Sequence, residues 1–260
     1  MIKNCFVYNI GMTYKDAIEE VPLAPQNLSF GIRGDIDITG LMKIMLHKYF
    51  TMTALIASLF MPGIALALDV NISADLPSVQ VLHNGQKITI MRNQNLDNRI
   101  NPAYAKTSRK CPPFCIQPIE LAPGVRTIGE LEMLHYLKKV SDGDKSILVI
   151  DSRTPDSVAW GSIPGSVNIP ADSLDSDKTD PVTVRQTIET QLGAKYRKGH
   201  WDFSKARTLV LFCNGLWCGQ SPRNIKGLLK LGYPASKLIW YRGGMQDWEA
   251  VGLTTVESDE

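Results

Sequence analysis

Two cysteines, Cys213 and Cys218, lie five positions apart in the stretch LFCNGLWCGQSP. A cysteine thiolate is a strong nucleophile that attacks sulfur directly, without a metal or an organic cofactor. We therefore predict that Cys213 is a catalytic nucleophile, and we expect no cofactor or metal. Three roles remain open for Cys218: a residue that lines the loop, a second thiol that resolves an intermediate, or the disulfide partner of Cys213.

The residues around the two cysteines predict a loop between a strand and a helix. Residues 208–212 are an apolar run of strand length that ends immediately before Cys213. Ser221 is a good N-cap residue and Pro222 suits the first position of a helix, so we expect the helix to begin there. Ligands bind at the carboxyl edge of the strands in open α/β sheets, which is where this loop would lie.

Glycines in this loop favour a backbone that binds anions. Gly215 and Gly219 allow tight turns that direct several N–H groups inward, above the N-terminus of the following helix. Such a setting lowers the pKa of a thiol from its usual value of about 8.5. We therefore expect main-chain amides to hold Cys213 as a thiolate, or as a persulfide anion.

The chain around the loop has the pattern of an α/β domain. An amphipathic helix is predicted over 127–140, where leucine or isoleucine recurs every three residues, and a second helix follows residue 221. Continuous apolar runs are typical of a parallel sheet that helices cover on both faces. Short runs of this kind predict four buried strands, at 146–151, 165–170, 208–212 and 237–241.

Residues 68–120 combine a predicted hairpin with a linker that contains two cysteines. Two β-rich runs within 79–92 flank an Asn-Gly pair, which is a strong signal for a hairpin turn. Cys111 and Cys115 lie in the stretch CPPFC, where we predict a short structural disulfide. Two alternatives are a metal site, which would need further ligands, and a second redox pair that communicates with the other cysteine loop.

Residues 42–67 have the three parts of a secretory signal peptide. Lysines precede an apolar stretch, a Pro-Gly pair breaks it, and Ala-Leu-Ala ends it in the small-x-small pattern of a cleavage site. We therefore predict a periplasmic or secreted protein whose mature chain begins at Leu68. The alternative is a membrane anchor formed by 49–68, which is long enough to span a bilayer. Residues 1–41, which precede the signal, are interpreted as an over-extended N-terminus.

The composition of the 260-residue chain argues against some classes of partner. The chain is 44% hydrophobic and 21% charged, with a formal net charge of +2. It contains no run of lysine or arginine, so we expect no nucleic-acid partner. The predicted mature chain has four cysteines, and an even number in an oxidising compartment favours disulfide formation.

Three stretches of the chain together resemble the rhodanese (sulfurtransferase) domain family. They are VIDSRTPDSVAWGSIPGSVNIP at 149–170, LVLFCNGLWCGQS at 209–221 and WYRGGMQDWEAVGLTTV at 240–256. Their order and their distances fit one rhodanese-like domain over 121–258. The resemblance implies a parallel sheet flanked by helices, preceded in this chain by the small β-hairpin region.

The resemblance also implies a reaction. Cys213 would take a sulfane sulfur from a small donor, thiosulfate or a polysulfide, and pass it as a persulfide to a thiol or a cyanide-type acceptor. An acceptor that is itself a protein is not identified by the sequence. The backbone that would surround the persulfide comprises Asn214, Gly215, Leu216, Trp217, Cys218 and Gly219. Family positions that we expect to be structural are matched by Asp151, Arg153, Gly243, Gly244 and Trp248.

The chain departs from the family pattern in and near the loop. The loop is longer than in common single-domain members, which predicts a wider binding site and a preferred donor other than thiosulfate. The basic residue that is usual in the loop is absent, and Ser162 replaces a frequent histidine.

Two other classes of function remain open. The first is a thiol–disulfide protein that cycles Cys213 and Cys218, although their four intervening residues differ from the C-x-x-C spacing of thioredoxin-like motifs. The second is a non-catalytic rhodanese-like binding module. A cysteine phosphatase on a related fold is disfavoured, because it would need an arginine where this loop has Gly219.

Overall fold

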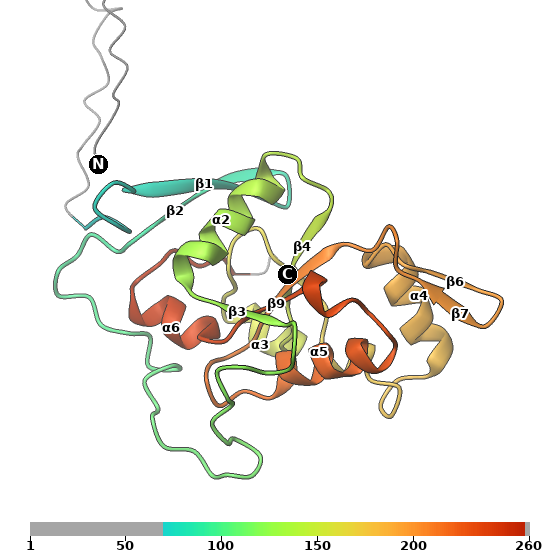
Figure 1. Ribbon diagram of the computed structural model, residues 1–260. Coiled ribbons are helices and arrows are strands. Elements are labelled where there is room, and N and C mark those ends of the chain that lie inside the picture. Colours follow the sequence, from blue (N-terminus) through green and yellow to red (C-terminus); the bar gives the residue numbers. More distant parts are fainter. Residues whose placement is uncertain (1–69, 258–260) are drawn as a thin grey trace, which may run out of the picture. The chain divides into compact units, whose positions relative to one another are not determined.

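Five parallel strands form the centre of the structure, a computed structural model that describes residues 70–257 (Figure 1). The strands are β3 (Arg126–Ile128), β4 (Ile147–Asp151), β5 (Val167–Asn168), β8 (Thr208–Phe212) and β9 (Leu238–Tyr241). Their spatial order is β3-β9-β8-β4-β5. The three central strands are apolar runs buried along almost their whole length, as a parallel sheet covered on both faces requires. The predicted α/β class with a parallel sheet is therefore confirmed.

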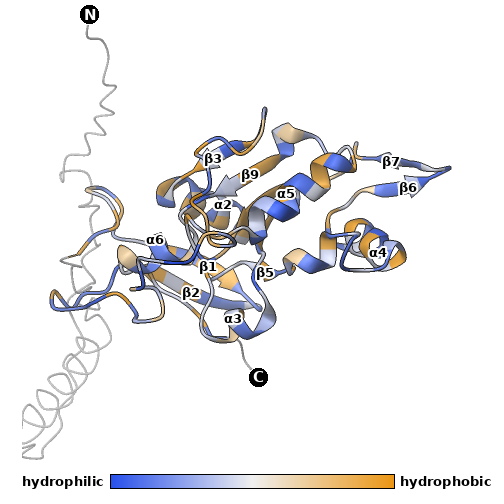
Figure 2. Cartoon of the chain, turned by 90° about the horizontal axis from the view of Figure 1, so that it is seen from below, coloured by the Kyte–Doolittle hydropathy of each residue, from blue (hydrophilic) through white to orange (hydrophobic). Residues whose placement is uncertain are grey.

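Helices cover both faces of the sheet (Figure 1). One core cluster joins the sheet to α2 (Glu130–Ser141) and α6 (Gly244–Ala250), and a second joins it to α4 (Pro181–Gln191) and α5 (Gln220–Lys230). Figure 2 shows polar and apolar residues alternating around α5, as expected of a helix with one buried side. The short helices are α3 (Pro155–Ala159), η2 (Ala171–Leu174) and η3 (Ala235–Lys237).

The alternation of side chains along the strands separates the two cores. In β8, Val210 and Phe212 belong to the cluster that contains α2, whereas Leu209 and Leu211 belong to the cluster that contains α5. Phe212, the last residue of β8, is paired with Asp151, the last residue of β4. The carboxyl ends of these two strands therefore meet at one edge of the sheet, and the loops that follow them share that edge.

The predicted N-terminal hairpin is confirmed. Strands β1 (Ser78–His83) and β2 (Gln86–Met91) pair antiparallel across an Asn-Gly turn in which both residues have positive φ. Val81 and Ile90 are buried in the same cluster as α2 and α6. The hairpin therefore shares one hydrophobic core with the sheet, and the boundary that the sequence suggests after residue 120 does not divide that core.

The first long helix begins later than its apolar spacing predicts. The predicted range was 127–140, but α2 begins at Glu130 and Gly129 is its N-cap, whose amide donates to Glu132 Oε2 at 3.1 Å. Ile128 is buried as the last residue of the edge strand β3. The side chain of Ile128 enters the same hydrophobic core as the buried residues of α2, although it does so from a strand. For this reason Ile128 fits the apolar spacing of the helix.

A second hairpin was not predicted. It consists of β6 (Lys195–Arg197) and β7 (His200–Asp202), which pair antiparallel and are almost wholly exposed. Figure 2 shows this hairpin as largely hydrophilic. Three-residue strands without an alternating apolar pattern carry no periodic signal in the sequence.

The predictions for the N-terminus lie outside the described residues. These are the over-extended segment 1–41, the signal peptide 42–67 and the alternative membrane anchor 49–68. Within the described part of the chain, no helix has both the length and the apolar character needed to cross a bilayer.

Candidate active site

Both cysteines of the predicted loop lie at the carboxyl edge of the sheet and beneath the surface. Cys213 directly follows β8, and Cys218 precedes Gly219, the N-cap of α5. The two cysteines are 2% and 4% exposed, and both are free thiols. The amide of Cys218 donates to the carbonyl of Gly215 at 2.9 Å, so the loop turns back on itself. The two thiols therefore share one buried site, in which Cys213 Sγ donates to the main-chain carbonyl of Cys218 at 3.5 Å.

Ser221 contacts the sulfur of Cys213 instead of capping the helix. Its hydroxyl donates to Cys213 Sγ at 3.1 Å and accepts a hydrogen bond of 3.1 Å from Trp240 Nε1. Because the indole N–H is donated to the hydroxyl oxygen, the hydroxyl proton is directed at the sulfur. The prediction that Ser221 is the N-cap is wrong, since α5 begins at Gln220 after Gly219. The buried contact with sulfur explains why a good capping residue does not cap here.

The acidity of Cys213 differs from the sequence-based expectation. Burial raises the pKa of Cys213 well above its usual value, because a charged thiolate loses its hydration there. The hydrogen bond to Cys218 raises this pKa further, and the hydroxyl and amide of Ser221 lower it only in part. The prediction that loop amides hold Cys213 as a thiolate is therefore wrong for the unreacted site.

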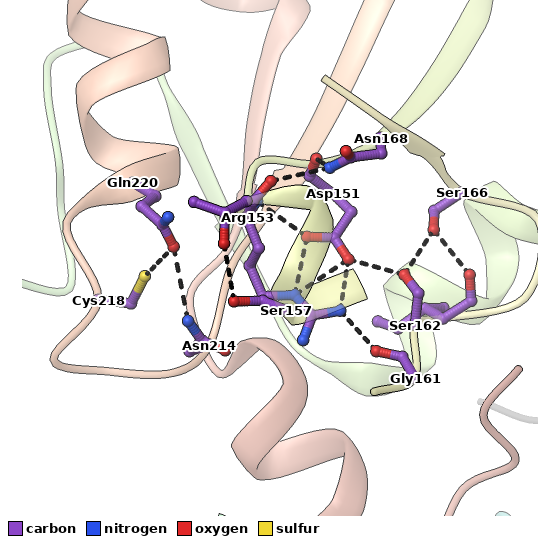
Figure 3. Close-up of polar contacts among 12 residues, drawn as sticks. Asp151, Arg153, Ser157, Gly161, Ser162, Ser166, Asn168, Asn214, Cys218 and Gln220 are labelled. Carbon is purple, nitrogen blue, oxygen red and sulfur yellow. Dashed lines mark hydrogen bonds and ion pairs between the residues drawn. The ribbon is translucent and has the colours of Figure 1, made fainter. Parts of the chain in front are cut away.

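Cys218 is the acidic thiol of the pair. The hydrogen bond from Cys213 and the N–H groups of Gln220 and Asn214 lower the pKa of Cys218 to about 7, against the opposing effect of burial. Its Sγ lies 3.3 Å from Gln220 Oε1, which in turn lies 3.5 Å from Asn214 Nδ2 (Figure 3). The loop amides that we expected around the sulfur of Cys213 thus act on the sulfur of Cys218.

Alkylation of Cys218 will follow an ionisation near neutral pH. The rate of its modification by iodoacetamide should rise as the pH passes through about 7, because only the thiolate reacts. In Cys213→Ala the midpoint should move to higher pH, because the thiol that donates to Cys218 is lost. Timed alkylation followed by peptide mapping measures both midpoints. A midpoint that is the same in the variant would show that Cys213 does not lower the pKa of Cys218.

The first turn of α6 holds the backbone of the loop. The amide of Met245 donates to the carbonyl of Cys213, and that of Gln246 donates to the carbonyl of Asn214, both at 2.9 Å. Gly244 permits this close approach, since a Cβ at its position would lie 2.3 Å from the carbonyl oxygen of Cys213. Gly244 therefore has the structural role that we expected.

The linker that precedes the sheet covers the loop at Trp217. The indole N–H donates to Gln246 Oε1 at 2.9 Å, and the side-chain Nε2 of Gln246 donates to the carbonyl of Tyr104, also at 2.9 Å. The ring of Phe114 meets that of Trp217 edge-on, with 5.6 Å between centroids. The guanidinium carbon of Arg109 lies 3.6 Å from the centroid of the same indole. The side chain of Trp217 is thus fixed by the linker and by α6 together.

A disulfide lies in the same linker. It joins Cys111 to Cys115, whose Cα atoms are 4.7 Å apart. Two residues later, the amide of Gln117 donates to the carbonyl of Leu216 at 2.9 Å, which ties the linker to the loop backbone. The disulfide and Trp217 both line a pocket of about 880 Å³. Within the described chain, no three His, Cys, Asp or Glu side chains are grouped as metal ligands, so the metal alternative for the CPPFC cysteines has no support there.

Comparison with protein families identifies the region that contains this site. Residues 133–251 match the family model described as Rhodanese-like domain. The chain carries a rhodanese-like domain. No curated protein sequence matches the chain.

Three solved structures show the extent of structural similarity. The BH2092 protein of Bacillus halodurans has a TM-score of 0.36 at 16% identity, over 51% of this chain and 77% of its own. Thiosulfate sulfurtransferase of Pseudomonas aeruginosa has a TM-score of 0.36 at 17% identity, over 54% of this chain and 22% of its own. The human single-domain sulfurtransferase TSTD1 has a TM-score of 0.32 at 22% identity, over 48% of this chain and 95% of its own.

A buried ion pair at the end of β4 stabilises the rhodanese-like domain (Figure 3). Arg153 donates from Nε to Asp151 Oδ1 at 2.9 Å and from Nη2 to Oδ2 at 2.7 Å. Its guanidinium also donates to the carbonyl of Gly161 at 2.6 Å and to the hydroxyl of Tyr104 at 3.0 Å. Ser162, at the position where the family often has histidine, donates to Asp151 Oδ2 at 2.7 Å. The pair thus connects the strand to two other segments, as expected of structural residues.

The loop residues that were predicted to bind substrate divide into two groups. The amide groups of Asn214 act on the sulfur of Cys218, and Gly215 closes a turn with the backbone of Cys218. Leu216 and Trp217 contact the linker instead. Gly219 is the exposed N-cap of α5. The rhodanese-like domain therefore has a two-thiol site at one end of the loop and a covered surface at the other.

Proposed function

We propose that the rhodanese-like domain is a sulfurtransferase that carries sulfane sulfur as a persulfide on Cys213. One observation supports the proposal most strongly: Cys213 Sγ accepts the Ser221 hydroxyl at 3.1 Å and donates to the carbonyl of Cys218, whose own thiol is the more acidic of the two. A buried thiol with a base beside it can become a nucleophile when a reactant arrives. The backbone from Asn214 to Gly219 would then surround the transferred sulfur. The family match supports sulfurtransferase chemistry in general.

In this proposal Cys218 acts as the base for Cys213. With a pKa of about 7, Cys218 is substantially a thiolate at neutral pH and takes the proton of Cys213 as attack begins. With thiosulfate as donor, the Cys213 thiolate attacks the outer sulfur, a sulfur–sulfur bond forms, and sulfite leaves. Cyanide then attacks the outer sulfur of the persulfide, thiocyanate leaves, and the Cys213 thiolate is restored. A polysulfide reacts in the same way and leaves as a shorter polysulfide.

We also propose that the protein works outside the cytoplasm, in the periplasm or after secretion. The sequence at 42–67 supports export, and the disulfide in the linker agrees with it, because disulfides persist in oxidising compartments. N-terminal sequencing of protein from the cell envelope should give a chain that begins at Leu68. Recovery of residues 49–68 with the protein in the membrane fraction would instead support the anchor.

A thiol–disulfide protein is the second candidate function. It is favoured by the presence of two free thiols in one site, of which one has a pKa of about 7. In this case Cys213 and Cys218 would cycle between dithiol and disulfide forms without carrying sulfur. If neither thiol reacts with sulfur donors or disulfides, the domain would be a binding module.

Sulfur loading tests the proposed function in Cys218→Ser, in which no neighbouring thiol can consume the persulfide. The reaction is run at alkaline pH, where Cys213 ionises without its base. After treatment with thiosulfate or polysulfide, peptide mass mapping should find one added sulfur on Cys213, and cyanide should release it as thiocyanate. The matched control, Cys213→Ser/Cys218→Ser, should gain none. If Cys218→Ser gains no sulfur from either donor while the wild type forms a disulfide between residues 213 and 218, the second candidate is correct.

A further inference from the structure

Transfer of sulfur to an external acceptor needs only one cysteine, yet two free thiols share the buried site. Cys213 and Cys218 are unpaired, whereas Cys111 and Cys115 are joined as a disulfide. The role of base does not require a second sulfur, since a carboxylate or an imidazole would serve. The presence of a thiol at this position therefore needs a separate chemical reason.

The surroundings of Cys218 are those of a reactive sulfur. A cysteine that only fills space lies among apolar groups and has no need of polar partners. Cys218 Sγ instead lies 3.3 Å from Gln220 Oε1 and faces the main-chain amides of Gln220 and Asn214. Gln220 Oε1 accepts a hydrogen bond from the neutral thiol, whereas the N–H groups of Gln220 and Asn214 stabilise the sulfur anion that forms when the thiol ionises. Because the residue is only 4% exposed, that anion is shielded from solvent.

The loop fixes the relative position of the two cysteines. The turn between Gly215 and Cys218 brings the Cys218 carbonyl to within 3.5 Å of Cys213 Sγ. The Ser221 hydroxyl, 3.1 Å away, holds the sulfur of Cys213 from the helix side. A nucleophile that is held beside its target reacts in preference to one that must arrive from solution. Any persulfide formed on Cys213 would therefore meet Cys218 before it meets an external thiol.

We propose that Cys218 resolves the Cys213 persulfide, so that the domain reduces sulfane sulfur to hydrogen sulfide; this inference rests on the proposed function. Cys218, which took the proton of Cys213 during loading, first releases that proton to water. Its thiolate then attacks Cys213 Sγ, the inner sulfur of the persulfide. A bond forms between the two cysteine sulfurs, the bond from Sγ to the outer sulfur breaks, and the outer sulfur leaves as HS⁻ with the electron pair.

The electrons balance within this step. The outer sulfur is reduced to the level of sulfide, and the two cysteines are oxidised to a disulfide. A dithiol reductant then restores both thiols by exchange with the Cys213–Cys218 disulfide. The substrate class is therefore a sulfane sulfur donor together with a dithiol, and dithiothreitol is the reductant used in the test.

Sulfide release in a single turnover tests the inference. Reduced full-length wild type and Cys218→Ser, freed of reductant, are each treated with thiosulfate or polysulfide at alkaline pH. The wild type should release close to one HS⁻ per chain and form the disulfide between residues 213 and 218. Cys218→Ser should keep the sulfur on Cys213, with sulfide release reduced at least about tenfold by loss of the adjacent nucleophile. Addition of dithiothreitol should make sulfide release continuous in the wild type.

The linker disulfide provides a matched control. Cys111→Ser/Cys115→Ser should release sulfide at the wild-type rate. In the wild type, peptide mapping distinguishes a disulfide between residues 111 and 115 from one between residues 213 and 218. If sulfide release is lost in this control, the linker pair is the resolving group and the inference is wrong.

The possible outcomes separate this inference from the proposed function. Wild type that retains sulfur on Cys213 and releases no sulfide would overturn the inference and leave the proposed function in place. If the added sulfur is found on Cys218 of the wild type, Cys218 has attacked the outer sulfur of the persulfide, and this result would also overturn the inference. Cys218→Ser without added sulfur would instead overturn the proposed function itself.

Discussion

Arg153→Met will destabilise the domain by about 3–5 kcal/mol, because it leaves the carboxylate of Asp151 buried without its charged partner. Both residues are 0% exposed, so water cannot replace the lost guanidinium. The variant also removes the donors that serve the carbonyl of Gly161 and the hydroxyl of Tyr104. Thermal unfolding followed by circular dichroism should show a decrease in Tm on the order of 10 °C.

An exposed ion pair in the same domain provides the control for this prediction. Lys138 and Asp142 pair on the surface of α2, and their side chains are 50% and 60% exposed. Lys138→Met should change stability by at most about 1 kcal/mol, because exposed pairs are well solvated in either state. Replacing both buried partners, in Asp151→Leu/Arg153→Met, should recover part of the loss, since no unpaired charge then remains. Equal effects of Arg153→Met and Lys138→Met would contradict this account of the buried pair.

The parts of the fold that the sequence predicts are those whose residues are buried on both faces. The apolar runs predicted at 146–151, 208–212 and 237–241 correspond closely to β4, β8 and β9, because a central parallel strand is apolar along its whole length. The hairpin of β6 and β7 has no such signal, since its polar residues are almost all exposed. Burial pattern therefore determines which elements could be predicted.

The position of the catalytic candidate could be predicted, but its acidity could not. The boundaries that place Cys213 at the edge of the sheet are set by local sequence. Its pKa depends on burial and on which group meets which sulfur. One of these groups is Ser221, which Trp240 orients from the neighbouring strand. Because helix capping is a sufficient local role for Ser221, no feature of the sequence indicates its contact with sulfur.

The cover over the loop could not be predicted either. It depends on contacts between Phe114 and Trp217 and between Gln117 and Leu216, which are far apart in the chain. The linker that supplies them is irregular and has no periodic apolar pattern. Long-range contacts of an irregular segment are set by the assembled fold, so the sequence indicated only that a linker was present.

Gly244→Ala will disturb both the stability of the domain and the geometry of the two-thiol site. The added Cβ would lie 2.3 Å from the carbonyl oxygen of Cys213 and 2.9 Å from the amide nitrogen of Gly215, and both atoms belong to backbone that cannot rotate away. Alanine is also strained at the φ of +58° that this residue adopts. Together the steric and backbone effects should lower the free energy of unfolding by about 2–5 kcal/mol. Urea unfolding measures this change.

The same contact links the stability of α6 to the chemistry of the loop. To accommodate the Cβ, the first turn of α6 must move away from the loop, which weakens the bond from the Met245 amide to the Cys213 carbonyl. Gly252→Ala is the matched control: its φ is +69°, but the added Cβ would meet Asn93 no closer than 3.6 Å. The control should therefore lose only the backbone contribution of about 1–2 kcal/mol and keep the wild-type alkylation midpoint of Cys218. If Gly244→Ala were no less stable than Gly252→Ala, the close approach of α6 to Cys213 would not be what holds the loop.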